Sequence, residues 1–134
     1  MKRGRAYVDS SLLVAILFRE RSSAAAWRAF RSQDVRVTVG LARAEVMAAL
    51  AREGRATRDA DALFDRMYVF HPDSDLVSEC DEVLGTGALK GADLWHCAAA
   101  LALAGPRGRK GLAFLTLDDR QRTAMRRLGF RVGP

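Results

Sequence analysis

Residues Tyr7–Leu17 read YVDSSLLVAIL, a run that is apolar or hydroxylic except for one carboxylate, Asp9. A carboxylate is costly to remove from water unless hydrogen bonds or a cation compensate it. The segment RAYV before Asp9 is typical of a strand, and SSLLVAILFRE after it is typical of a helix. Asp9 therefore stands at a strand-to-helix junction, where it could cap the helix, bind a ligand, or do both.

The same alternation of strand and helix patterns continues along the chain. Further strands are expected at VRVTV (35–39), MYVFHP (67–72), GLAFLTL (111–117) and FRV (130–132). Further helices are expected at residues 22–33, 40–54, 57–67, 73–85, 91–105 and 118–129. This order predicts an α/β fold with a mostly parallel central sheet. A length of 134 residues predicts a single domain, residues 1–134.

Composition narrows the class of protein. The net charge of +6 favours a polyanionic partner, nucleic acid above all, but does not identify one by itself. No segment approaches the ~20 apolar residues that span a bilayer, so we expect no membrane segment. The two cysteines, Cys80 and Cys97, form no CxxC motif. We expect free thiols and a cytoplasmic protein.

Three further acids break the local pattern. Glu45 has Leu41, Ala42, Ala48 and Ala49 as its helical neighbours, so it interrupts an apolar stripe. Each acid also has a purely structural interpretation, and for Glu45 it is a boundary residue whose stem is packed.

The other two acids lie at expected helix starts. Asp93 opens an alanine-rich helix, where the helix dipole favours an acid. Asp118 follows GLAFLTL and could cap the next helix, with Gln121 completing a capping box and Asp119 as a first-turn acid. His96 shares a helix face with Asp93, but taken alone it is expected to be a packed core or boundary histidine.

The fold class gives these acids a possible common purpose. In a parallel sheet the functional crevice lies at the carboxyl ends of the strands, where Asp9 and Asp118 both fall. Carboxylates that converge without a base are typical ligands of Mg²⁺ or Mn²⁺. Such ions support in-line displacement at phosphorus. Ser10 and Thr116 are hydroxyl groups placed to assist.

Four segments, in order, resemble the PIN-domain family and, within it, the small VapC-type toxins. YVDSSLLVAIL is similar to the opening strand with its first aspartate, and LARAEVMAAL to the helix that carries a glutamate. LKGADLWHCAAALALA is similar to the segment in which an aspartate precedes a histidine by three positions. FLTLDDRQRTAMRRLGFRV is similar to the closing strand, T-x-D step and helix.

The resemblance implies a three-layer α/β/α fold and a Mg²⁺- or Mn²⁺-dependent ribonuclease. The catalytic and metal-binding positions would be Asp9, Glu45, Asp93 and Asp118, with Asp119 as the alternative fourth acid. It also implies a cognate antitoxin protein as partner. We further expect a homodimer, which the apolar helices SSLLVAILF and SSAAAWRAF favour.

Basic residues near the acidic motifs are candidates for phosphate contacts, namely Arg43, Lys90, Arg120 and Arg122. A haloacid-dehalogenase-like phosphatase would need a D-x-D step, whereas Ser10 and Ser11 follow Asp9. One alternative from another class stays open, a non-catalytic RNA- or antitoxin-binding module on the same scaffold.

Overall fold

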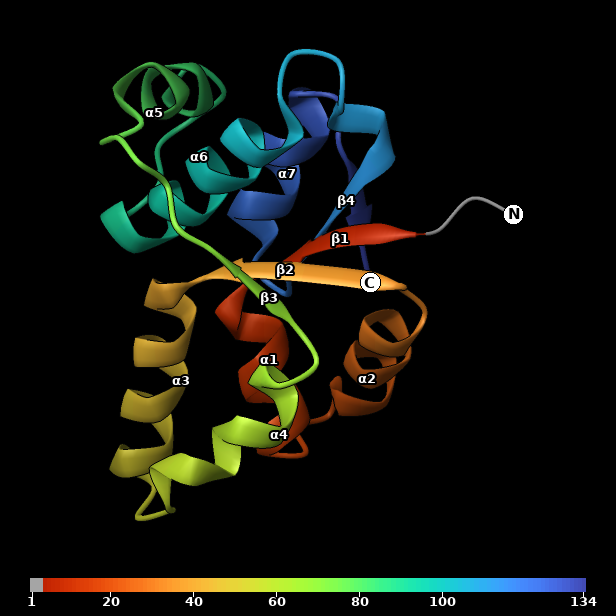
Figure 1. The fold of residues 1–134 in the computed structure, drawn as a ribbon, viewed down its shortest axis with the longest axis vertical. Coiled ribbons are helices and arrows are strands. Elements are labelled where there is room, and N and C mark those ends of the chain that lie inside the picture. The colour runs from red at the N-terminus through yellow and green to blue at the C-terminus, as the bar shows by residue number, and fades with distance from the viewer. Residues whose placement is uncertain (1–3) are drawn as a thin grey trace.

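A computed structural model describes residues 4–134, so the first three residues of the expected domain lie outside the described part. Its centre is a five-stranded sheet in the order β3-β2-β1-β4-β5 (Figure 1). Every neighbouring pair is parallel, which confirms the expected sheet. The strands are β1 (Arg5–Val8), β2 (Val35–Val39), β3 (Tyr68–Phe70), β4 (Leu112–Leu115) and β5 (Arg131–Gly133).

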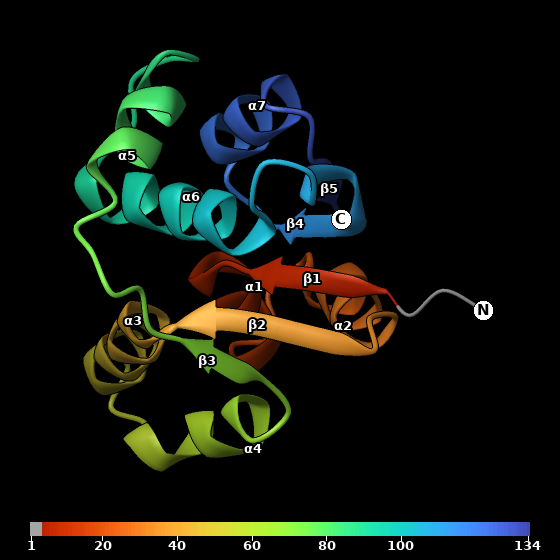
Figure 2. The same cartoon turned by 45° about the horizontal axis from the view of Figure 1, so that its top comes forward.

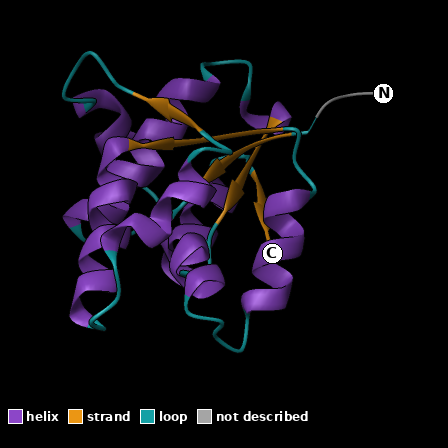
Figure 3. Cartoon of the chain, turned by 60° about the horizontal axis from the view of Figure 1, so that its bottom comes forward, coloured by secondary structure: helices purple, strands orange, loops and turns teal. Residues whose placement is uncertain are grey.

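Helices cover both faces of the sheet, as Figures 1 and 2 show, so the three-layer α/β/α fold is confirmed. One layer consists of α1 (Ser10–Leu17), α2 (Ser23–Arg31), α3 (Gly40–Arg52) and α4 (Asp61–Phe64). The other consists of α5 (Val77–Leu84), α6 (Gly91–Ala104) and α7 (Asp119–Arg127). Two short 3-10 helices, η1 (Thr57–Ala60) and η2 (Arg109–Gly111), complete the helical structure that Figure 3 colours purple. No helix within residues 4–134 is long and apolar enough to cross a membrane.

The strand side chains alternate between two hydrophobic cores. In β1, Ala6 and Val8 pack against the α1–α4 layer, whereas Tyr7 packs against the α5–α7 layer. In β4, Leu115 belongs to the first core and Phe114 to the second. Because both faces of these strands are buried, they appear in the sequence as continuous apolar runs.

Two helical expectations are corrected by the structure. Residues 57–67 were expected to form one helix, but they divide into η1 and the single turn of α4, because the chain must turn back at once into β3. The expected helix over 73–85 begins only at Val77. Leu76 before it is buried in a left-handed conformation with φ of 54°, which a helix cannot continue through.

The strand order creates a crevice at the centre of the sheet. β1 has β2 on one side and β4 on the other, and the chain leaves β1 toward one helical layer and β4 toward the opposite one. The backbone N–H of Asp9 donates to the carbonyl of Leu115 at 2.9 Å, which holds the two strand ends together. Ligand sites of α/β sheets lie at such a point of divergence.

Candidate active site

Asp9 lies at the bottom of this crevice and is only 3% exposed. Its Oδ2 accepts a hydrogen bond from the backbone N–H of Ser11 at 3.1 Å, and its Oδ1 accepts one from Gln121 Nε2 at 3.2 Å. The Thr116 hydroxyl lies 3.2 Å from Oδ2. The two N–H donors, from Ser11 and Gln121, compensate part of the loss of water around this buried carboxylate.

Asp9 combines a structural position with a place in the site. Its bond to Ser11 is the N-cap of α1, so the cap interpretation is confirmed. A cap needs only that bond, however. Asp9 also contacts Thr116, which follows β4, and Gln121, which lies in α7 on the opposite face of the sheet from α1. The surroundings of Asp9 are therefore built from both helical layers.

Thr116, which directly follows β4, organises these donors. Its hydroxyl lies 2.7 Å from Gln121 Oε1, 3.2 Å from Asp9 Oδ2 and 3.2 Å from Ser11 Oγ. A hydroxyl has a single proton to donate. The contact with Gln121 is the shortest and therefore the best hydrogen bond, and it orients the amide so that Nε2 faces Asp9.

The capping box expected at α7 forms only in part. Asp118 is the N-cap of α7, and its Oδ1 accepts from the backbone N–H of Gln121 at 2.8 Å. The Gln121 side chain does not return to the Asp118 backbone, because it is completely buried beside Asp9 and also donates to the carbonyl of Asp93 at 3.2 Å. The backbone N–H of Asp118 donates instead to Thr116 Oγ1.

A second buried row reaches the site from β1. Tyr7 Oη lies 2.6 Å from His96 Nδ1, and His96 Nε2 lies 2.5 Å from Glu45 Oε1. His96 is completely buried, as expected for a core histidine, but it also contacts two proposed site residues: besides Glu45, Asp9 Oδ1 is 3.7 Å from Nε2. Tyr7 lies within an apolar strand pattern, which gives no signal for this contact.

The charge state of this row follows from its surroundings. Burial by itself lowers the pKa of His96, but the hydrogen bond with Glu45 and the negative charges of Asp9, Glu45 and Asp93 raise that pKa overall. Burial, followed by the charge of Asp9, raises the pKa of Tyr7 well above its usual value, so the phenol keeps its proton. In the neutral and in the protonated imidazole alike, Nε2 can donate to Glu45.

Asp93, in the first turn of α6, is the acid that lacks compensation. Within residues 4–134 its carboxylate makes no hydrogen bond or ion pair, although it is only half-exposed. Burial raises the pKa of Asp93, and the nearby charges of Asp118, Asp9 and Glu45 raise it further. The charge of a protonated His96 opposes this rise in the pKa of Asp93 but is the smallest of the contributions.

The auxiliary candidates divide clearly. Asp119 is a first-turn acid as expected, with a side chain 91% exposed and paired with Arg122, whereas Asp118 is only partly exposed and caps α7. In the described part of the chain, Ser10 makes no side-chain hydrogen bond. Its neighbour Ser11 accepts from the backbone N–H of Leu117 at 3.0 Å and so links α1 to the turn after β4.

The basic candidates also fall into two groups. Arg43 pairs with Asp61, and Arg122 donates to the carbonyl of Thr116 at 3.0 Å, so both already have protein partners. Lys90 and Arg120 are exposed, and neither takes part in an ion pair with any residue from 4 to 134.

The donor chemistry of the site fits a hard divalent cation. Every acid offers carboxylate oxygens, and a cation would relieve the repulsion that raises the pKa of Asp93. In the described structure, no three His, Cys, Asp or Glu side chains lie close enough to enclose a metal ion as they stand. Mg²⁺ is usually held by one or two carboxylates, with water and substrate phosphates completing its shell, so a site for such an ion does not need three side-chain ligands.

Comparisons with known proteins agree with the fold. The family model of the PIN domain matches residues 6–126. The chain therefore belongs to the PIN-domain family. It is 37% identical over 130 residues to Ribonuclease VapC46 of Mycobacterium tuberculosis (strain ATCC 25618 / H37Rv), covering 94% of both chains. It is 30% identical over 139 residues to Ribonuclease VapC49 of the same strain, covering 96% of this chain and 94% of that one.

The fold is also found in a solved structure. The structure of VapBC-1 from nontypeable Haemophilus influenzae contains a chain that superposes with a TM-score of 0.66 and covers 95% of both chains. The sequences are 14% identical, so this likeness concerns the fold alone.

The contrast between Asp93 and Asp118 gives a stability test. In the absence of divalent metal, we expect Asp93→Asn to leave the free energy of unfolding unchanged or higher. Because the pKa of Asp93 is raised in the folded state, its ionisation at neutral pH makes the folded state less stable. Asparagine removes that charge. Asp118→Ala loses a helix cap and should cost about 0.5–2 kcal/mol.

Urea unfolding of both variants and the parent at neutral pH, in chelator, measures this difference. Equal losses of stability in the two variants would mean that Asp93 is a structural residue of α6.

Proposed function

We propose that this protein is a metal-dependent endoribonuclease that hydrolyses RNA phosphodiester bonds, and that it is the toxin of a VapBC-type toxin–antitoxin pair. The support for the proposal is a set of contacts at the crevice: Gln121 bonds to Asp9, to Asp118 and to the backbone of Asp93, and His96 lies against Asp9 and Glu45. The VapC ribonuclease relatives support the substrate class. Residues 1–134 would form one nuclease domain.

The four acids would hold Mg²⁺ or Mn²⁺, with Asp118 rather than Asp119 as the fourth. When bound, such an ion activates water and stabilises the charge that develops at phosphorus. The chain's own residues fix the acids: Gln121 and Ser11 hold Asp9, and His96 holds one oxygen of Glu45. Hydrogen-bond partners of metal ligands of this kind orient the ligands and tune their affinity.

The basic residues would bring the RNA to these acids. With a net charge of +6, the chain attracts phosphates in general. Lys90, at the N-cap of α6, and Arg120, at the start of α7, flank the acids and have no acidic partner in the described structure. We assign phosphate contacts to these two, whereas Arg43 and Arg122 act through the protein groups that they already bind.

The relationship to the VapC ribonucleases also supports a proposal for the protein partners. A cognate antitoxin would bind the chain, because a chain in the structure of a VapBC complex shares its fold. The protein would act in the cytoplasm. A homodimer would use the apolar residues of α1 and α2 that remain only partly covered, among them Ile16 and Trp27. Light scattering at micromolar concentration tests the dimer, and a monomer would contradict it.

Cleavage in the presence of metal tests the central activity. We expect the purified protein to cut structured RNA with Mg²⁺ or Mn²⁺ and to be inactive in chelator. Asp118→Asn should reduce cleavage to background, because it removes a carboxylate from the site. Asp65→Asn is the matched control: it removes the same charge from an exposed side chain at the end of α4 and should retain activity.

Cleavage that persists in excess chelator would contradict the metal mechanism. RNA binding without cleavage under any metal condition would favour the non-catalytic module instead.

The row from Tyr7 to Glu45 yields a second test. Tyr7→Phe removes the hydroxyl that orients His96, and His96 holds Glu45. Loss of a direct hydrogen-bond partner of a metal ligand usually costs about 10–100-fold in activity. Tyr7 acts on Glu45 only through His96, so we expect a fall in cleavage toward the lower end of that range. Tyr68→Phe is the control, because Tyr68 is 70% exposed on the edge strand.

Steady-state cleavage rates and circular dichroism spectra of both variants provide the measurement. A folded Tyr7→Phe protein with parental activity would show that the row serves packing alone.

A further inference from the structure

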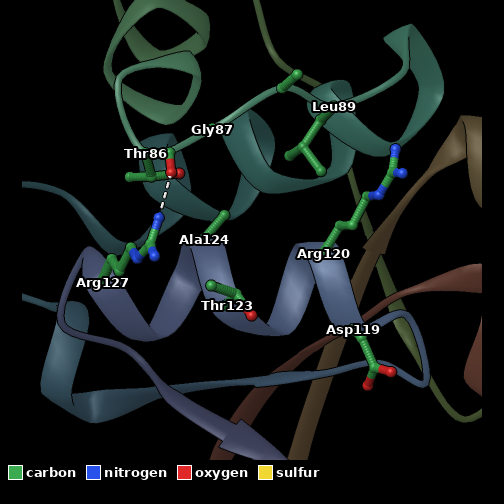
Figure 4. A pocket seen from close by; sticks show the side chains of 9 residues that line it. Thr86, Gly87, Leu89, Asp119, Arg120, Thr123, Ala124 and Arg127 are labelled. Carbon is green, nitrogen blue, oxygen red and sulfur yellow. Dashed lines mark hydrogen bonds between the residues drawn. The ribbon is translucent and has the colours of Figure 1, made fainter.

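A pocket of about 310 Å³ lies between α7 and the segment 86–89 that leads into α6 (Figure 4). Its volume is at the lower end of the range for small-ligand sites, about 300–1,000 Å³. Its walls include Thr86, Leu89, Arg120, Thr123, Ala124 and Arg127. One acid, Asp119, also lines it, whereas Asp9, Glu45, Asp93 and Asp118 do not.

The pocket adjoins the acidic site through both of its walls. On one wall, Leu89 directly precedes Lys90, the N-cap of α6, and Asp93 lies in the first turn of that helix. On the other wall, Arg120 lies two residues after Asp118. The Gln121 amide bonds α7 to the carbonyl of Asp93, so the two walls are tied together beside the acids.

The lining combines apolar surface with unused polar groups. Leu89 and the buried Ala124 give apolar contact area, and Thr123 offers an exposed hydroxyl. Arg120 has no acidic partner within residues 4–134, because the neighbouring Asp119, which also lines the pocket (Figure 4), pairs with Arg122. The positive charge of Arg120 therefore remains available to a ligand.

The far end of the pocket is fixed by the protein itself. Arg127 donates to the carbonyl of Thr86 at 2.6 Å, the bond drawn as a dashed line in Figure 4. This bond fastens the segment 86–89 to α7, so of the two arginines that line the pocket only Arg120 has no hydrogen-bond or ion-pair partner among residues 4–134.

We propose that this pocket binds one nucleotide of the RNA, next to the phosphodiester that is cut. The apolar wall would receive the face of the base, while Arg120 would bind the adjoining phosphate or stack on the base. The inference deepens the proposed function, since it assumes that RNA is the substrate. It assigns Arg120 and Thr123 to substrate selection rather than to chemistry.

RNA binding in chelator tests the pocket without requiring cleavage. Thr123→Trp fills the pocket from an exposed position, and Arg120→Ala removes its free charge. We expect Thr123→Trp to weaken binding of a fluorescent single-stranded oligoribonucleotide about tenfold, the effect of losing one stacked base. Arg120→Ala should reduce the slope of log affinity against log salt by about one.

Arg126→Ala is the matched control, because it removes the same charge from an exposed position on α7 that does not line the pocket. It should bind RNA within about twofold of the parent. Ala88→Trp, on the opposite wall, repeats the test on an exposed loop residue should Thr123→Trp fail to fold.

Parental RNA affinity in the folded pocket variants would overturn the proposal. An equal loss of RNA affinity in Arg126→Ala would also overturn it, because the RNA would then be attracted by net charge alone. So would pocket variants that bind RNA normally and lose affinity only for a protein partner. A failure of the proposed function is distinguishable, because it would abolish cleavage with metal in the parent and leave this binding comparison intact.

Discussion

The rest of the structure depends on the burial of one carboxylate, Asp9, at the centre of a parallel sheet. Its donors come from opposite sides, Ser11 from α1 on one face and Gln121 from α7 on the other. Satisfying this group therefore requires both helical layers to be in place around the carboxyl ends of β1 and β4. The same requirement brings Asp118 and Asp93 to the crevice, because α7 carries one and is bonded through Gln121 to the other.

The acids of the site differ in how completely the protein compensates them. Asp9 is surrounded by donors, Glu45 is held by a buried histidine and Asp118 caps α7, whereas Asp93 has no partner in the described structure. Hydrogen bonds thus position three of the carboxylates. The fourth, Asp93, has no such bond, and its ionised form is disfavoured by burial and by the negative charges of the other three. A site with this imbalance attracts a cation and, through the surrounding arginines and lysines, an anionic polymer.

Much of this could be predicted from the sequence because periodicity and strand ends are local signals. Asp9 and Asp118 follow apolar strands, and Glu45 interrupts an apolar helical stripe. Gln121 could not be found in this way, since its spacing from Asp118 is equally explained by a capping box, and its bond to Asp9 spans 112 residues. The partnership of Tyr7 with His96 and the choice of Ser11 over Ser10 likewise depend on how helices pack across the sheet.

The most direct test of a cation site at this crevice is the position of a bound ion. Crystals of the protein soaked in Mn²⁺ and measured near the manganese absorption edge would show the ion by its anomalous scattering. The account predicts a peak in contact with carboxylate oxygens of Asp9 and Asp93. A crystal saturated with Mn²⁺ that shows no peak there, or peaks only at other surface carboxylates, would contradict it.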